Sequence, residues 1–164
     1  MNPYIERILG YLGDQDPIAV LQQTPGKLEQ VLETLTDFEA SYEEGKWTAR
    51  EILAHLADVE LLMGYRLRQA VSEANYVVQV MDQDTWAKRY KKLEPSHSVE
   101  TFRSLRSWNL ALFSTFGLED WNKEVTHPER GTETVDLMVS FLAGHDLNHV
   151  HQLEQITGLT NKNK

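Results

Sequence analysis

The chain has no cysteine among its 164 residues. This absence excludes disulfides, thiolate zinc sites, iron–sulfur clusters and a cysteine nucleophile. Any soft nucleophile in the chemistry of this protein would therefore have to be brought in by a co-substrate.

Positive charge is scarce, and long apolar runs are missing. Lys and Arg number 16 against 25 Asp and Glu, which gives a net charge of −9 with neutral histidines and disfavours affinity based on phosphate contacts. Charges interrupt every helix candidate, whereas a membrane span needs about 20 apolar residues. Acids also stand where a signal peptide would have a basic start. We therefore expect a cytoplasmic protein with no nucleic-acid and no membrane partner.

The remaining composition is that of a globular protein. Hydrophobic residues make up 41% of the chain and aromatic residues 9%, which is enough for one domain with its own core. We predict a single domain over residues 1–160 and a frayed C-terminal tail over residues 161–164.

Apolar residues recur at helical spacing along almost the whole sequence. They predict a short helix over residues 4–12 that ends at Gly13. Proline then stands at a first helical position twice. Pro17 predicts a short turn, and Pro25 predicts the start of a longer helix that ends before an acidic loop over residues 36–47.

The strongest helix start is at Thr48. Thr48 and Glu51 form a capping box, and the apolar stripe that follows predicts a helix to about Ser72. Residues 73–97 predict a long connection with one short helix.

Two more long helices complete the pattern. The first begins near Ser98 and closes at Gly117. Residues 118–131 predict a loop, and the last helix runs from near Thr134 to a capping glycine at Gly158. The expected apolar face of the first of these helices is Phe102, Leu105, Trp108, Leu112 and Phe116.

No run predicts a strand. We predict an all-α fold, a four-helix bundle with a long crossover between the second and third main helices plus short extra helices. The crossover allows these two helices to run parallel.

Three of the six histidines stand on apolar helix faces. His55 lies in the middle of the helix that begins at Thr48, and His145 and His149 are four residues apart in the last helix. Four residues turn about 400°, so these two imidazoles share one face. They predict a three-nitrogen site for a divalent metal with an open position, because a cation would satisfy three polar groups that are costly to bury unpaired. The alternative is three core histidines, each with its own hydrogen bond.

The other histidines predict surface positions. His151 is roughly 200° around the helix from His149, and His97 and His127 lie in predicted loops. From its loop His127 could also approach a site, although nothing in the sequence requires it. Gln152 shares the stripe of His149 and is either an orienting donor or a buried amide.

The sequence from His145 to His149 differs from the zinc-peptidase motif His-Glu-x-x-His. Its second residue, Asp146, is one carbon shorter than the glutamate base of that motif, so a peptidase of this class is not expected. Asp146 either faces solvent or anchors a ligand. Gly144 in mid-helix marks either the close approach of another element or a packing glycine.

Three segments resemble the signatures of the DinB/YfiT-like superfamily. They are GKWTAREILAHLADVE at residues 45–60, DQDTWA at residues 82–87 and HDLNHVHQ at residues 145–152. The resemblance implies a four-helix bundle that binds a divalent metal ion, nickel or zinc, through His55, His145 and His149. It also implies a homodimer, since members often form dimers. Some members resemble thiol transferases or maleylpyruvate isomerases, and many are described as metal-dependent hydrolases.

Three functions follow from these observations. The first is a metal-dependent enzyme that activates water or a low-molecular-weight thiol for a small-molecule substrate, with its catalytic residues still unassigned. The second is a non-catalytic, metal-stabilised protein that binds a small molecule or a partner in stress responses. The third is a helical interaction protein without metal. A thiol co-substrate would need cationic or polar contacts, for which the candidates, otherwise solvated charges of a helix face, are Arg50, Arg66, Arg68 and Arg103. The tryptophans Trp47, Trp86 and Trp108 either line a pocket or pack in the core, and Asp58, one turn after His55, either orients a ligand or faces solvent.

Overall fold

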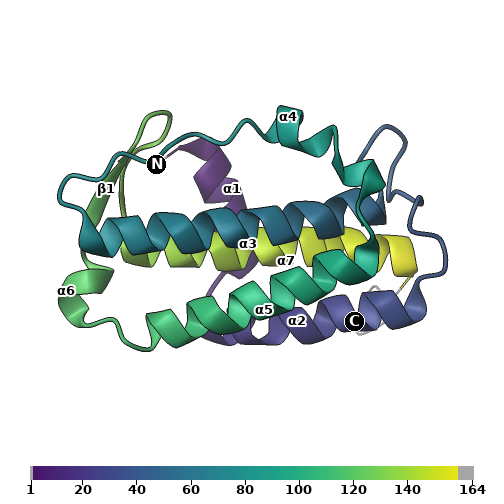
Figure 1. Ribbon diagram of the computed structural model, residues 1–164, viewed down its shortest axis with the longest axis horizontal. Coiled ribbons are helices and arrows are strands. Elements are labelled where there is room, and N and C mark those ends of the chain that lie inside the picture. Colours follow the sequence, from purple (N-terminus) through teal and green to yellow (C-terminus); the bar gives the residue numbers. More distant parts are fainter. Residues whose placement is uncertain (1, 159–164) are drawn as a thin grey trace.

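Four long helices form the bundle in the computed structural model, which describes residues 2–158. The predicted tail over residues 161–164 lies outside this range. Figure 1 shows two of the helices running in one direction and the other two in the opposite one, so that the helices on either side of the long crossover are parallel. The predicted all-α bundle is confirmed. In chain order its main helices are α2 (Pro17–Thr34), α3 (Ala49–Ser72), α5 (Pro95–Phe113) and α7 (Val135–Thr157).

Short elements fill the connections. The helix α1 (Pro3–Leu12) precedes the bundle and packs on α7. The crossover between α3 and α5 holds α4 (Gln83–Ala87) and the 3₁₀ turn η1 (Tyr90–Lys92), and α6 (Leu118–Trp121) follows α5.

A small antiparallel hairpin corrects the prediction of a loop over residues 118–131. Its strands are β1 (Glu124–His127) and β2 (Gly131–Thr134), with Glu124 opposite Thr134. Val125 and His127 face inward while their neighbours are exposed. Four residues of alternation are too few to distinguish a strand from a loop by sequence, and the hairpin gains further support from hydrogen bonds between Thr126 and the crossover.

The helix ends are capped largely as predicted. The Thr48 and Glu51 side chains form the capping box of α3, and the Thr134 hydroxyl accepts from the backbone N–H of Leu137 at the start of α7. Gly158 adopts a left-handed conformation, with φ of 71°, after the last turn of α7. Such positive φ values favour glycine.

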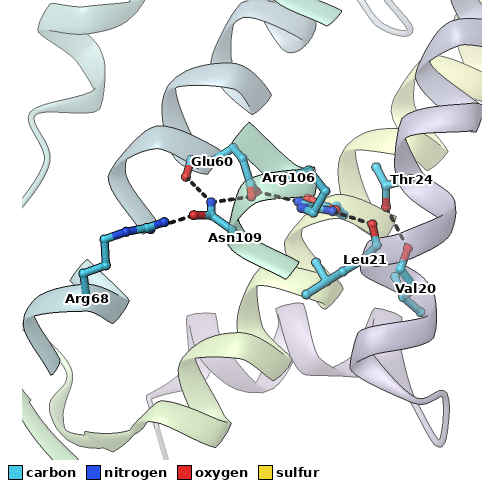
Figure 2. A network of polar contacts seen from close by, with 8 residues as sticks. Val20, Leu21, Thr24, Glu60, Arg68, Arg106 and Asn109 are labelled. Carbon is cyan, nitrogen blue, oxygen red and sulfur yellow. Dashed lines mark hydrogen bonds and ion pairs between the residues drawn. The ribbon is translucent and has the colours of Figure 1, made fainter. Parts of the chain in front are cut away.

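The helix α2 is continuous through Pro25, which corrects the predicted helix start there. Proline lacks the N–H that would bond to the carbonyl four residues earlier, which is that of Leu21. This carbonyl accepts instead from Arg106 Nη1 at 2.9 Å, and the Thr24 hydroxyl donates to the carbonyl of Val20 at 3.0 Å (Figure 2). The helix therefore continues because a side chain from α5 supplies the missing donor.

The inward face of α5 also differs from the prediction. Trp108 is 67% exposed, whereas Arg106 and Asn109 are buried between Phe102 and Phe113. Periodicity assigns apolar residues to the core. Here polar residues of α5 are buried instead, because α3 and α7 each bury a carboxylate that requires a partner.

Arg106 is the centre of the resulting polar network. It forms ion pairs of 2.7 Å with Glu60 of α3 and Asp146 of α7. Asn109 donates to Glu60 at 2.7 Å and accepts from Arg68 at 2.7 Å (Figure 2). The network ties all four main helices together at mid-bundle.

Candidate metal centre

The structure brings the three predicted histidines together. His55 comes from the middle of α3, and His145 and His149 come from successive turns of α7. One nitrogen of each ring lies within 4.8 Å of the others, and His55 Nε2 is 3.0 Å from His145 Nε2. All three side chains are buried.

Burial lowers the pKa of all three imidazoles. The pKa of His55 falls to about 3 and that of His149 to about 4, and the pKa of His145 lies well below its usual range. Loss of hydration disfavours the charged ring, and at His55 and His145 the neighbouring imidazoles add to the effect. The cluster is therefore neutral at pH 7, the form in which an imidazole nitrogen binds a metal ion.

Two side chains fix the ring of His149. Its Nδ1 donates to Gln152 Oε1 at 2.7 Å, and Gln152 Nε2 donates to the Tyr42 hydroxyl at 3.3 Å. Trp47 stacks on this ring at 6.3 Å with an interplanar angle of 18°, and its ring centroid is 4.8 Å from that of His55. Gln152 is therefore an orienting acceptor, which leaves Nε2 of His149 free to act as a ligand.

The donor set fits a divalent ion. The buried Nδ1 atoms of His55 and His145 have no hydrogen-bond partner among the described residues. Separate core histidines would each hold a hydrogen bond to another group, as His149 does to Gln152, whereas among the described residues His55 and His145 make a polar contact only with each other, through Nε2. Three neutral nitrogens that face one another match instead the ligand type of zinc, nickel and related ions.

Two cavities open beside the cluster. One, of about 140 Å³, is lined by His55 and His145 together with Arg66 and His127. The other, of about 250 Å³, is lined by His149 with Trp47, Tyr42 and Gln152. One cavity therefore reaches the cluster at His55 and His145, and the other reaches it at His149.

Two predicted surface residues line the first cavity. His127 is only 3% exposed, because β1 directs it inward, and Arg66 is only 6% exposed. Both corrections have a physical cause: the hairpin was not predicted, and Arg66 lies 11 residues after His55, about 20° around the helix. A helical wheel would have placed Arg66 on the stripe of His55. His97 and His151 are exposed, as predicted.

Asp146 and Gly144 settle two open alternatives. Asp146 is buried and pairs with Arg106, so it does not face solvent, and among the described residues it makes no hydrogen bond that would anchor a histidine of the cluster. A Cβ at Gly144 would lie 2.4 Å from the carbonyl oxygen of Ile8. The glycine therefore marks the close approach of α1 to the turn that carries His145.

The remaining candidates lie away from the cluster or at its margin. Arg50 pairs with Glu39 at 2.6 Å, and Arg103 lies at the surface 3.7 Å from Glu29. Asp58 is half-buried, and burial raises the pKa of its carboxyl. Trp86, in α4 of the crossover, is exposed.

The fold and the site together define the class of protein: a four-helix bundle with three clustered histidines, in which a long crossover joins two parallel helices. The sequence model of the DinB superfamily matches residues 21–153, so the chain belongs to this superfamily. None of the helices within residues 2–158 is long and apolar enough to cross a membrane.

Related proteins match over most of the chain. "Putative metal-dependent hydrolase YfiT" of Bacillus subtilis is 26% identical over 145 residues, which cover 85% of this chain and 82% of that protein. A protein of the same description from Oceanobacillus iheyensis is 30% identical over 122 residues, with coverage of 74% and 69%.

Solved structures share the fold. That of Bacillus subtilis YfiT, described as having an unusual four-helix bundle topology, matches with a TM-score of 0.79 and 27% identity over 88% of this chain and 83% of that one. A mycothiol-dependent maleylpyruvate isomerase matches with a TM-score of 0.69 and 15% identity, over 84% of this chain and 59% of that one. At that identity the likeness concerns the fold alone.

Proposed function

We propose that the chain is a metal-dependent enzyme of small-molecule chemistry, with one divalent ion held by His55, His145 and His149. The observation that carries the proposal is the convergence of three buried, neutral imidazoles within 4.8 Å beside an accessible cavity. The described activity of the relatives supports it. Nickel and zinc are the ions we propose, because imidazole suits both.

When bound by these three imidazoles, a divalent ion would supply Lewis acidity, which would lower the pKa of a water or a thiol and provide a nucleophile at neutral pH. The residues of the chain hold the ligand rings and exclude bulk water. Gln152 fixes the tautomer of His149, and Trp47 covers the His55 and His149 rings. Hydrolysis and thiol transfer share this arrangement, and the lack of cysteine in the chain requires that a thiol come from a small co-substrate.

A non-catalytic, metal-stabilised binding protein is the alternative. A structural site is four-coordinate and closed by protein ligands. Here the cluster provides three imidazoles, and a cavity of about 140 Å³ reaches two of them. The open side favours the enzyme.

Metal content of tag-free protein tests the proposal. We expect about one equivalent of nickel or zinc in the parent and in His151→Ala, an exposed histidine of the same helix, and little in His149→Ala. Esters, amides and thiol–electrophile pairs are then screened with the metal that is found. Absence of metal from the parent after reconstitution with both ions would overturn the proposal. The homodimer stays a prediction, which light scattering on the same samples tests.

A further inference from the structure

Arg66 and Arg106 are both buried, but they differ in their counter-ions. Arg106 holds two carboxylates at 2.7 Å. Arg66 is 6% exposed and donates to the carbonyl oxygen of Gln79 at 2.5 Å, yet no carboxylate of residues 2–158 forms an ion pair with it. Its Nε has no hydrogen-bond partner in the same part of the chain. A buried guanidinium without a counter-ion is strongly unfavourable, so the fold alone does not account for this residue.

The surroundings of Arg66 attract an anion. Arg66 lines the cavity of about 140 Å³ that reaches His55 and His145, and Arg130 lines the same cavity. Burial and the positive charge of Arg130 lower the pKa of Arg66, and Tyr76 and the carboxylate of Glu133 oppose this shift only in part, so the two cations are close enough to repel each other. Arg130 is neutralised by Glu133, with contacts of 2.5 and 2.9 Å. Glu129 also lines the cavity, but Arg66 is the cation of this lining for which the described residues provide no paired carboxylate.

His127 adds a hydrogen-bond donor to the same cavity. Its Nδ1 accepts from the backbone N–H of Glu129 at 3.2 Å. Burial and the nearby arginines lower the pKa of the ring, so the ring is neutral and its proton is on Nε2.

We propose that Arg66 and His127, with Arg130 beside them, form a subsite for the oxyanion of a small acidic substrate. A carboxylate or a phosphate would supply the counter-ion that Arg66 lacks, since the guanidinium fork matches the paired oxygens of either group. The assignment rests on the proposed function, because the cavity that holds the anion also holds two of the three imidazoles.

The position of the subsite sets the substrate class. Arg66 lies three helical turns after His55, about 16 Å along the axis of α3, and a long helical side chain leans back toward the N-terminus of its helix. The cavity lining mixes polar and apolar side chains, and its apolar part includes Val59, Leu62 and Phe141. A cavity of about 150 Å³ accommodates a benzene-sized molecule. The substrate is therefore an acid whose compact apolar body separates its anionic group from the bond that reacts at the histidines.

Binding of three matched probes tests the subsite. Benzoate and phenylphosphonate carry the two anionic groups on one body, and benzamide is the neutral analogue. Calorimetry on metal-loaded and metal-free protein is expected to show binding of at least one anion, with benzamide at least ~10-fold weaker. Arg66→Gln is expected to lose roughly 10- to 100-fold in anion affinity while keeping its metal content. Arg103→Gln, at an exposed position, is the control and is expected to keep both the anion affinity and the metal content of the parent.

Several outcomes would overturn the subsite. Equal binding of benzamide, no binding of either anion, or unchanged affinity in Arg66→Gln contradicts it. Anion binding that requires metal and ignores Arg66→Gln shows coordination to the metal instead. A crystal of the parent soaked with 4-bromobenzoate gives a readout without any variant, because the carboxylate must lie within hydrogen-bond distance of Arg66. If the parent does not bind metal, the proposed function is overturned but the subsite is not, because anion binding is also measured on metal-free protein.

Discussion

Pro25 and Arg106 complement each other across the contact between α2 and α5. Pro25 has no N–H to donate to the carbonyl of Leu21, and Arg106 Nη1 donates to that oxygen at 2.9 Å. The same guanidinium holds Glu60 and Asp146. One side chain therefore repairs a helix and neutralises two buried carboxylates.

The same substitution at the two buried arginines is expected to have opposite effects. Arg106→Met leaves Glu60 and Asp146 buried without a cation, which should lower the free energy of unfolding by about 3–5 kcal/mol. Arg66→Met removes an unpaired charge but keeps an apolar stem, so it should raise that free energy by about 1 kcal/mol. Urea denaturation of both variants measures the difference, and a loss at Arg66 as large as that at Arg106 would contradict the assignment.

Gly144 is expected to tolerate no side chain. An alanine Cβ there meets the carbonyl oxygen of Ile8 at 2.4 Å, and the resulting displacement of α1 should cost about 1–3 kcal/mol of stability despite the better helix propensity of alanine. Gly10→Ala is the control, because that helical position is open and should gain up to ~1 kcal/mol. Thermal unfolding compares the two, and equal melting temperatures would show that α1 moves freely.

Gln152→Ala is expected to weaken metal binding without unfolding the protein. The variant removes the acceptor that fixes His149 Nδ1, and loss of such an orienting partner costs roughly 10- to 100-fold in metal affinity. Competition with a chromophoric chelator measures the affinity. Gln155→Ala, at an exposed position one turn away, should match the parent, and a parent-like Gln152→Ala would contradict the orienting role.

Metal-free protein is expected to lose stability as the pH falls below about 6.5. The pKa of His55 is lowered to about 3 and that of His149 to about 4 in the folded state, so between these values and about 6.5 the unfolded chain binds more protons. The free energy of unfolding is therefore at its full value above about pH 6.5 and decreases as the pH falls toward the folded-state pKa values. At pH 5 the expected loss is on the order of 2 kcal/mol for each ring.

Urea titrations of metal-free protein at pH 7.5 and 5 measure this loss. His149→Gln should show a smaller pH dependence, because glutamine does not titrate. An equal slope in parent and variant would assign the pH dependence to other groups.

Sequence periodicity was sufficient to predict the bundle and the apolar helix faces on which the three histidines stand. His145 and His149 share a face by helical geometry alone, and the helix start at Thr48 fixes the face of His55. These are local properties of single helices, which a sequence displays directly. The prediction that the three rings meet rested on the cost of burying three unpaired imidazoles, because spacing within one helix does not place another helix against it, and the resemblance pointed to the same three residues.

The polar interior could not be predicted in the same way. Arg106 and Asn109 are buried because Glu60 and Asp146 come from other helices, and no pattern within α5 records those partners. Trp108 was expected in the core for the same reason and is exposed. His127 was missed because its inward direction depends on a hairpin of four-residue strands.

The contact between α1 and α7 has a consequence for how the chain matures. Both α1 and α2 pack on α7, the last helix in the sequence, and Gly144 admits α1 to the turn beside His145. A chain leaves the ribosome from its N-terminus, so α1 has no helix to pack on, and α2 lacks one of its two main neighbours, until nearly the whole chain has been made. His55 emerges long before the two imidazoles that it meets, and the cluster is completed only when synthesis is almost over.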